Sequence, residues 1–480
     1  MKNVQIKTSH DELIHLKGES IENLKRALRG DLITEEDADY ETARRVWNGS
    51  INKYPALIVR CSGVADVITA VKFAKEHQLL LSIRAGGHNV SGASVVDQGL
   101  VIDVSQMRSV HVNPEKRTAL VESGARLGDL DHETTAFGLA TPVGVVSETG
   151  VAGLTLHGGI GWLTRKHGLS IDNLKAIEIV TPDGEWKRTS EDEYTDLFWA
   201  LRGGGGNFGV VTAFEFNLHP IEPTVPYIMT IYPLEESKKI LSFCKEYMAK
   251  APDEMMMIFT YGKIPAEPEI DEKQHGKTAV IVFGCYTGSM NDAEKVMGPL
   301  RDISTPIADL SGSMPWKDLQ SMEDEAYPDV MFYYWKSINL DSLDDEVIPI
   351  LDRYARDMPS VKTTIDIAFY GGAMNRVPPE ATAFVNRNNS YIIAIEANWH
   401  DEADSDSNIK WARDLYKDLK PYSGKGTYLN FPGYIEEKDE MLREAYGQNL
   451  DRLIQVKKKY DPDNLFPGLL NISSKVRQPV

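Results

Sequence analysis

The stretch that decides the fold runs from Arg84 to Gly92 and reads RAGGHNVSG. It follows directly on a predicted strand over residues 79–83, so the chain leaves the strand through two glycines and a histidine. Glycine permits positive φ and lets backbone N–H groups approach a ligand closely, so such a turn can cradle a phosphate without a lysine. Two further turns of this kind, TGVAGLTLHGGIG at residues 149–161 and RGGGGNFG at 202–209, also lie beside predicted strands.

Several familiar sites do not match these turns. No Gly-Lys-Ser/Thr follows the glycines, as a Walker A loop requires, and no G-x-G-x-x-G opens the first strand–helix unit. The histidines 88, 157 and 167 form no close metal-binding pair, so we predict no metal site. No Gly-x-Ser-x-Gly elbow supports a serine hydrolase, and the acidic tract 401–406 is interpreted as a solvated loop.

The sequence around the turns alternates between predicted helices and strands. Residues 62–71 place Val64, Val67, Ile68 and Val71 on one helical face, and a Pro-Asp-Gly turn joins strands near 177–180 and 185–187. The pattern of predicted elements changes after residue 222, where longer strands are separated by helices. We predict strands over 54–60, 100–104, 118–122, 210–217, 227–231, 279–286 and 391–398, and helices over 20–30, 235–250 and 440–460. This pattern predicts α/β or α+β layers.

Composition and charge exclude several classes of protein. The chain has 480 residues and a net charge of −19, which argues against nucleic acid or an anionic membrane as a partner. Its three cysteines, Cys61, Cys244 and Cys285, lie far apart and give no disulfide framework. There is no apolar leader and no run long enough to span a membrane, so we expect a cytoplasmic enzyme of two or three lobes.

Several motifs resemble the FAD-linked oxidases of the vanillyl-alcohol oxidase type. The strand PALIVR at 55–60 with the turn at 84–92 resembles the first half of their flavin domain, and residues 150–174 resemble the second half. DLFWALRGGGGNFGVVT at 196–212 resembles the end of that domain. Tyr428-x-Asn430-Phe431 and YDPDNLF at 460–466 resemble the C-terminal element of berberine-bridge-like enzymes, and the nearest subgroup is the bacterial one akin to 6-hydroxy-D-nicotine oxidase.

The resemblance implies a fold and a division of the chain. We expect an α+β, two-lobed FAD-binding fold of the vanillyl-alcohol oxidase type, with residues 1–222 as the FAD-binding domain. Residues 223–425 are expected to form a substrate domain, an antiparallel sheet backed by helices. Residues 426–480 are expected to return to the FAD domain as the berberine-bridge-like element. The flavin is expected at the junction of the lobes.

The resemblance also implies how FAD is held. In the family the histidine of this R-[AS]-G-G-H motif is bonded to the flavin, which here is His88. Some members add a link from a cysteine, whose aligned position here is Val146, so we expect one covalent bond. His157 stands where the family usually has glycine; it either faces the flavin or substrate or is merely tolerated. The expected FAD contacts are Arg84, Ala85, Gly86, Gly87, Asn89, Ser91, Gly92, Thr149, Gly150, Gly153, Leu154, Gly158, Gly159, Gly161, Trp162, Asn173, Gly209, Val211 and Asn430.

The implied reaction is hydride transfer from a small alcohol, sugar or amine to FAD, with reoxidation by oxygen to hydrogen peroxide. A base is needed, and the resemblance makes Tyr428 the candidate, provided that its surroundings lower its pKa from about 10; a buried core phenol is the alternative. Tyr334, within the aromatic run 332–335, is a candidate for the substrate pocket or for the sheet core. A dehydrogenase, an oxidative cyclase and a non-catalytic flavin protein stay open, as do the substrate and the oligomeric state.

Overall fold

The computed structural model describes residues 2–424 and 426–472, and its N-terminal part is built on a four-stranded sheet. The strand order is β3 (Asp31–Ile33), β4 (Leu57–Arg60), β6 (Leu100–Asp103), β5 (Leu81–Arg84), and the last three are parallel. These strands are short apolar runs, as expected for parallel strands that are buried on both faces. Helices α1 (Gly18–Ala27) and α3 (Val64–Glu76) and the hairpin β1 (Val4–Lys7) and β2 (Leu13–Leu16) pack on them.

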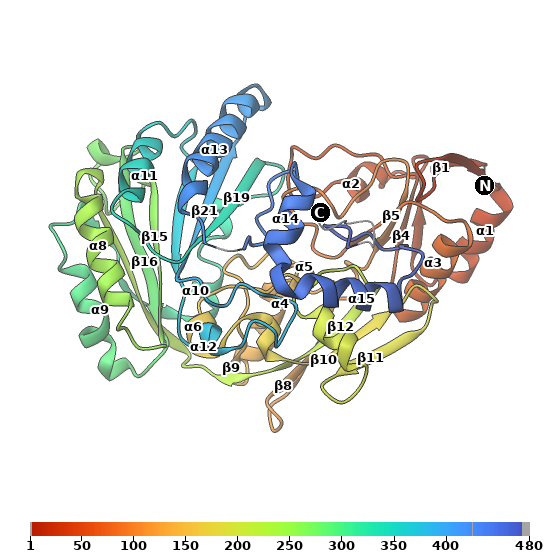
Figure 1. Cartoon of the computed structure of the whole chain (residues 1–480), viewed down its shortest axis with the longest axis horizontal. Helices are drawn as coiled ribbons and strands as arrows, with labels where there is room; N and C mark the ends of the chain where they lie inside the picture. The colour runs from red at the N-terminus through yellow and green to blue at the C-terminus, as the bar shows by residue number, and fades with distance from the viewer. Residues whose placement is uncertain (1, 425, 473–480) are drawn as a thin grey trace.

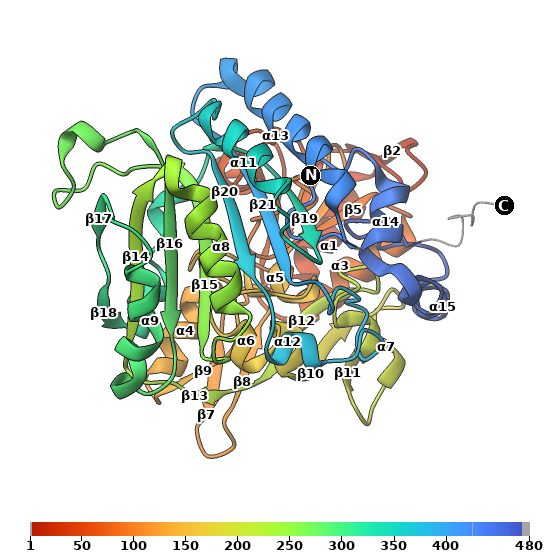
Figure 2. The ribbon, with the colours of Figure 1, turned by 60° about the vertical axis from the view of Figure 1, so that its left-hand side comes forward.

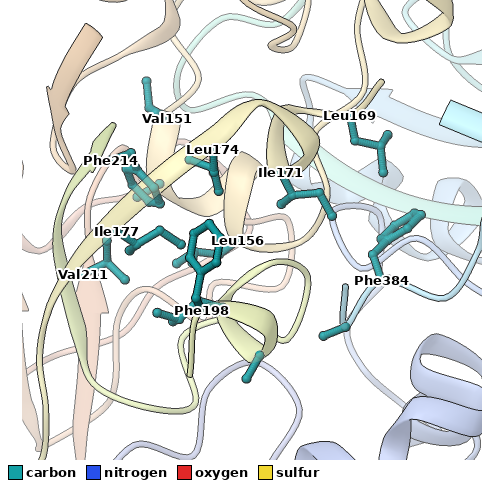
Figure 3. Close-up of a cluster of buried hydrophobic side chains, with 14 of the residues drawn as sticks. Val151, Leu156, Leu169, Ile171, Leu174, Ile177, Phe198, Val211, Phe214 and Phe384 are labelled. Atoms are coloured by element: carbon teal, nitrogen blue, oxygen red, sulfur yellow. The ribbon is translucent and has the colours of Figure 1, made fainter. Parts of the chain in front are cut away.

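A second, five-stranded antiparallel sheet follows. Its order is β11 (Trp186–Ser190), β10 (Leu174–Val180), β12 (Val210–Asn217), β8 (Thr118–Glu122), β7 (Val110–Asn113). Its apolar side chains share a core with the helices α4 (Leu127–Thr135), α5 (Val151–Leu156) and α7 (Thr195–Leu201). Figure 3 shows this core and, at its edge, Phe384, which comes from a segment nearly 170 residues further along the chain.

The third sheet has eight strands, all paired antiparallel. Seven follow the order β17 (Ala308–Asp309), β14 (Thr224–Pro233), β16 (Thr278–Tyr286), β15 (Met255–Lys263), β20 (Thr364–Phe369), β21 (Tyr391–Trp399), β19 (Phe332–Leu340), and β18 (Gly312–Pro315) pairs with β14. Strands β15, β16, β21 and β19 are labelled in the left half of Figure 1. Helices α8 (Ser237–Met248), α9 (Ala293–Arg301), α11 (Val347–Arg356) and α13 (Ser405–Leu419) cover one face (Figure 2). The other face is turned toward the N-terminal sheets. None of the helices in the described ranges is both long and apolar enough to span a membrane.

The C-terminal segment returns to the N-terminal part. The helix predicted over 440–460 is instead two helices, α14 (Lys438–Tyr446) and α15 (Leu450–Tyr460), because Gly447 turns the chain with a φ of +43°. The buried Lys457 ammonium donates to the Asn207 carbonyl (2.7 Å), the Phe466 carbonyl (2.6 Å) and the Asp461 carboxylate (2.6 Å). This lysine therefore ties the C-terminal segment to the third glycine turn.

A buried ion pair joins the second sheet's core to the segment between β20 and β21. The Arg387 guanidinium, fully buried, donates to both oxygens of Asp172, at 2.6 and 2.7 Å. Bidentate geometry makes this a strong charge-assisted contact. Phe384, three residues before Arg387, packs into the apolar core of the second sheet, so the same segment makes both an ionic and an apolar contact with it.

Breaking that pair is expected to destabilise the protein. Asp172→Ala leaves the Arg387 charge buried without a partner, which costs about 3–5 kcal/mol of unfolding free energy. Asp414→Ala, which breaks the exposed Lys410–Asp414 pair, is the matched control and is expected to cost about 0.5 kcal/mol or less. Urea denaturation of both variants measures the difference. Equal effects of the two substitutions would contradict this account.

Candidate active site

A cavity of about 1460 Å³ lies between the glycine turns and the third sheet. Pockets for drug-sized ligands measure roughly 300–1,000 Å³, so this cavity has room for a larger ligand and a small partner molecule. One side is formed by the glycine turns and by residues 467–469, which follow the Lys457 anchor. The opposite side is the face of the eight-stranded sheet that carries no helices.

The first two glycine turns touch each other through their backbones. A Cβ on Gly86 would lie 2.5 Å from the Gly150 nitrogen, and a Cβ on Gly161 would lie 1.7 Å from the Val143 carbonyl oxygen. Only glycine allows this packing. By contrast, a Cβ on Gly153 or Gly206 would meet nothing within 4 Å, and both residues line the cavity. The backbone is therefore open to a ligand at these two positions.

His88 lines the cavity at the end of the first turn. Its ring stacks on Trp47 with centroids 4.8 Å apart and an interplanar angle of 15°, and the Thr149 hydroxyl lies 3.5 Å from Nδ1. The Trp47 indole is held in place because its N–H donates to the Tyr327 carbonyl at 2.9 Å. Burial, with a smaller contribution from Arg126, lowers the pKa of His88 to about 3. The imidazole is therefore neutral at physiological pH and its nitrogen is available as a nucleophile.

Most of the residues predicted to contact the cofactor lie on this cavity. They are Ala85, Gly86, Gly87, His88, Asn89, Thr149, Gly150, Gly153, Leu154, Gly161, Trp162, Gly209, Val211 and Asn430. Val146, at the aligned position of the second linkage, lines it too, whereas Cys61, Cys244 and Cys285 do not. The predicted set is therefore largely brought together in space.

The remaining six predicted residues do not line the cavity, and their side chains or Cα positions pack behind its wall. Arg84 is buried and donates to the Asp103 carboxylate and the Ala43 carbonyl. The Asn173 amide donates to the carbonyls of His167 and Leu169, each at 2.9 Å. Ser91 donates its hydroxyl to Asn89 Oδ1 at 2.6 Å. The glycines 92, 158 and 159 pack against Ile51, Phe384 and Ser170, respectively.

The structure also corrects the prediction that Tyr334 lines the substrate pocket. Side chains alternate across a strand, and Tyr334 points to the helix-covered face of β19, where it is fully buried and donates its hydroxyl to Glu436 at 2.6 Å. The neighbouring Trp335 lines the cavity instead.

Tyr428 lines the cavity from the C-terminal segment and is 3% exposed. Its oxygen accepts a hydrogen bond from the Asn430 amide at 2.8 Å and faces the backbone N–H groups of Gly159 and Ile160. These donors lower the pKa, but burial outweighs them and raises the pKa of Tyr428 to about 12. The lowered pKa that a base role for Tyr428 requires is therefore not present, and the phenol is neutral near pH 7.

His157 lines the cavity beside the third glycine turn. Its Nδ1 lies 3.1 Å from the Gly153 carbonyl oxygen, and burial lowers its pKa. A neutral ring that donates to a backbone carbonyl suits a histidine with a fixed orientation. The structure therefore gives this residue a position on the cofactor side of the cavity, away from the sheet.

The sequence analysis missed a polar cluster on the sheet side of the cavity. Glu323, Asp366 and Glu396 all line it, together with Thr260, Thr364 and Tyr327. The overlooked pattern was a carboxylate in the middle of two otherwise apolar strands, TIDIAF at 364–369 and YIIAIEANW at 391–399. Carboxylates are seldom buried without a specific reason.

Comparison with known proteins gives the chain a family. Residues 55–190 match the family of FAD binding domains, and residues 427–473 match the family of berberine and berberine-like proteins. An FAD-linked oxidoreductase of Dictyostelium discoideum is 33% identical, covering 90% of this chain and 92% of its own. The (R)-6-hydroxynicotine oxidase of Paenarthrobacter nicotinovorans is 29% identical, covering 93% and 97%. The crystal structure of 6-hydroxy-D-nicotine oxidase from Arthrobacter nicotinovorans superposes with a TM-score of 0.81 at 27% identity, covering 92% and 96%.

The chain therefore belongs to the FAD-linked oxidoreductases of the berberine-bridge-like group and has the α+β fold of the vanillyl-alcohol oxidase type. The residues present fit FAD. The cavity is large, its backbone is open at Gly153 and Gly206, and a neutral His88 faces it. Clustered backbone N–H groups at such turns suit the pyrophosphate of a dinucleotide.

Proposed function

We propose that this protein is an oxidase that removes a hydride from a small alcohol, sugar or amine and reduces oxygen to hydrogen peroxide. The observation that carries this proposal is a cavity in which one wall combines His88, the open glycine turns and Tyr428, and the opposite sheet face carries a cluster of carboxyl groups. FAD, when bound, accepts the hydride and passes two electrons to oxygen. The remaining chemistry falls to the side chains of the chain.

His88 would hold FAD covalently, and as the one linkage. Its pKa, lowered to about 3, leaves a free lone pair for bonding to the flavin methyl carbon. Trp47 fixes the ring plane by stacking. The cofactor lobe would comprise residues 1–222 and 426–480, and the substrate lobe residues 223–425, whose exposed sheet face meets the cavity.

Tyr428 would orient the substrate as a hydrogen-bond donor. Its oxygen already accepts from Asn430, and its own proton is free to bond a substrate heteroatom in the cavity. The proton that leaves along with the hydride needs an acceptor whose pKa is closer to neutrality. Asp366, whose pKa burial raises to about 6, meets that requirement on the opposite wall.

Anaerobic mixing of the purified yellow protein with alcohols, sugars and amines tests the function. A substrate is expected to bleach the flavin absorbance, and admitting air is expected to restore it with release of equimolar peroxide. Reoxidation without peroxide, by an added acceptor alone, would instead indicate a dehydrogenase. A flavin that none of these compounds bleaches would contradict the proposal.

A further inference from the structure

Three carboxyl groups converge on the sheet side of the cavity. In the register of β20 and β21, Thr364 pairs with Glu396, so Asp366, two residues further along, lies on the same face as Glu396. The segment before β19 brings Glu323 to the same wall, and the Ser147 backbone and hydroxyl anchor that segment by donating to Asp324 at 2.7 and 2.5 Å. The three groups therefore come from separate elements.

Neutral hydroxyl groups donate hydrogen bonds to the carboxyl groups of the cluster and fix their orientation, but they bring no positive charge. Asp366 accepts from the Thr260 hydroxyl and, at 2.7 Å, from the Thr364 hydroxyl. Glu396 is 6% exposed, and its Oε2 accepts from the Tyr327 hydroxyl at 2.8 Å. Its other oxygen, Oε1, has no hydrogen-bond partner among the described residues, and Glu396 lines the cavity. This oxygen is therefore open to a ligand.

No cation of the described part of the chain pairs with the cluster. Lys263 and Lys362 also line the cavity, but the Lys263 ammonium donates to the Thr278 hydroxyl at 2.7 Å, and the exposed Lys362 forms no ion pair with the three carboxyl groups. Two other buried carboxylates of the chain, Asp172 and Asp461, each have a cation partner, Arg387 and Lys457 respectively. The buried Asp131 has none among the described residues, but it stands alone and accepts from the Gln320 amide at 3.1 Å, whereas here three carboxyl groups share one wall. The cluster therefore lacks the compensation that buried charges normally receive.

The pKa values of the carboxyl groups are raised because the groups are buried beside one another without a neighbouring cation among the described residues. Burial, assisted by the neighbouring negative charges of Asp366 and Asp324, raises the pKa of Glu323 to about 7. Burial and the charges of Asp366 and Glu323 raise that of Glu396 well above its usual range. A bound cation would reverse both effects by favouring the ionised forms.

Apolar and aromatic side chains on this wall favour an organic cation over a metal ion. Trp335 pairs with Glu396 across β19 and β21, Ala394 pairs with Asp366, and both line the cavity together with Ile392. An aromatic face such as that of Trp335 attracts an ammonium group. No group of three acidic, histidine or cysteine side chains in residues 2–424 and 426–472 is arranged to hold a metal ion.

We infer that the cavity selects an amine that is protonated in water, and that its nitrogen binds between Glu396, Asp366 and Glu323. This inference rests on the proposed function and narrows its substrate from alcohol, sugar or amine to a cationic amine. In the reaction the ammonium N–H proton passes to a carboxylate of the cluster. The α-carbon would then give up a hydride to bound FAD, and the C–N bond would become C=N. Oxygen would take up the two electrons with two protons, one from the hydride hydrogen and one released by the carboxyl group, to form hydrogen peroxide.

Binding of a charged but unreactive probe to the flavin-containing protein tests this inference separately from turnover. At pH 7.5, benzyltrimethylammonium is expected to bind at least about 30-fold more tightly than benzyl alcohol, as for a ligand that restores a buried charge pair. Glu396→Gln keeps the shape of the side chain and is expected to abolish most of that preference. Glu325→Gln, which changes an exposed carboxyl at the cavity rim, is the matched control and is expected to leave the affinity nearly unchanged.

The pH dependence gives a readout that needs no variant. Because Asp366 and Glu323 have raised pKa values of about 6 and 7, both are protonated below pH 5.5, and the probe is expected to bind more weakly there. Titration calorimetry near pH 6.5 in two buffers of different ionisation enthalpy is expected to detect proton release on binding.

The outcomes separate the two proposals. Equal affinity for the cation and the alcohol, or tight cation binding that Glu396→Gln leaves intact, would overturn the inference. Flavin bleaching by a sugar or neutral alcohol, but by no amine, would also overturn it and leave the oxidase function standing. Selective cation binding with no substrate that bleaches the flavin would uphold the inference and contradict the oxidase.

Discussion

His88→Ala is expected to release the flavin from the polypeptide completely on acid precipitation. The wild-type pellet should be yellow and fluorescent, because the imidazole is neutral, faces the cavity and is held by the Trp47 stack. Without the imidazole no carbon–nitrogen bond can form, so all colour should move to the supernatant. Absorbance and fluorescence of the two fractions measure this, and a wild-type pellet without colour would refute the covalent link.

A second histidine on the same cavity provides the matched control. His157→Ala should keep its flavin in the pellet, because the His157 ring lies on another part of the wall and donates a hydrogen bond to the Gly153 carbonyl. Mass spectrometry of wild-type peptides should find flavin only on the peptide with His88. The three cysteines are buried away from the cavity, and burial raises the pKa of each thiol. Flavin on a cysteine peptide would contradict a single linkage.

The cofactor side of the site was predictable because its chemistry is local. Glycines beside a strand end indicate a close approach that a side chain would block, and the Gly86–Gly150 backbone contact is such an approach. The histidine at the strand end is likewise a local feature. The sequence therefore predicted the position of His88 well, because the glycines that shape the turn and the histidine itself are neighbours in the chain.

The substrate side was not predictable, because it depends on the register between strands. Which face of a strand meets the cavity is fixed by its partners, so Tyr334 and Trp335 could not be told apart from the sequence. Asp366 and Glu396 are 30 residues apart and meet only through the pairing of β20 with β21. Trp47 lies in a loop between α2 (Tyr40–Arg44) and β4, where no periodic pattern of residues exists. Its stacking on His88 could therefore not be predicted from the sequence.

The break between α14 and α15 shows a similar limit at a smaller scale. The apolar periodicity on either side fits one helix, and a single glycine does not by itself end a helix. Gly447 ends it here because the chain must turn before Lys457 can reach Asn207. The break between the two helices therefore follows from a contact with the third glycine turn, which helix propensity alone does not reveal.

Tyr428→Phe is expected to slow flavin reduction about 10- to 100-fold while leaving flavin content and spectrum unchanged. The substitution keeps the ring, which packs edge to face on Phe431 with centroids 5.4 Å apart, and removes only the hydroxyl. Losing one neutral hydrogen bond costs about 0.5–1.5 kcal/mol, and misplacement of the substrate by about 1 Å can cost up to 100-fold in rate. Anaerobic stopped-flow measurement of the reduction rate tests this.

The pH dependence distinguishes an orienting donor from a base. With a pKa of about 12, only about one Tyr428 in 100,000 is ionised at pH 7. A phenolate base would therefore make the wild-type reduction rate rise about tenfold for each pH unit up to pH 10, and Tyr428→Phe would remove that rise. A donor loses nothing until its own proton leaves, so the ratio of wild-type to variant rates should stay constant between pH 7 and 10. A ratio that climbs with pH would restore Tyr428 as the base and remove that role from Asp366.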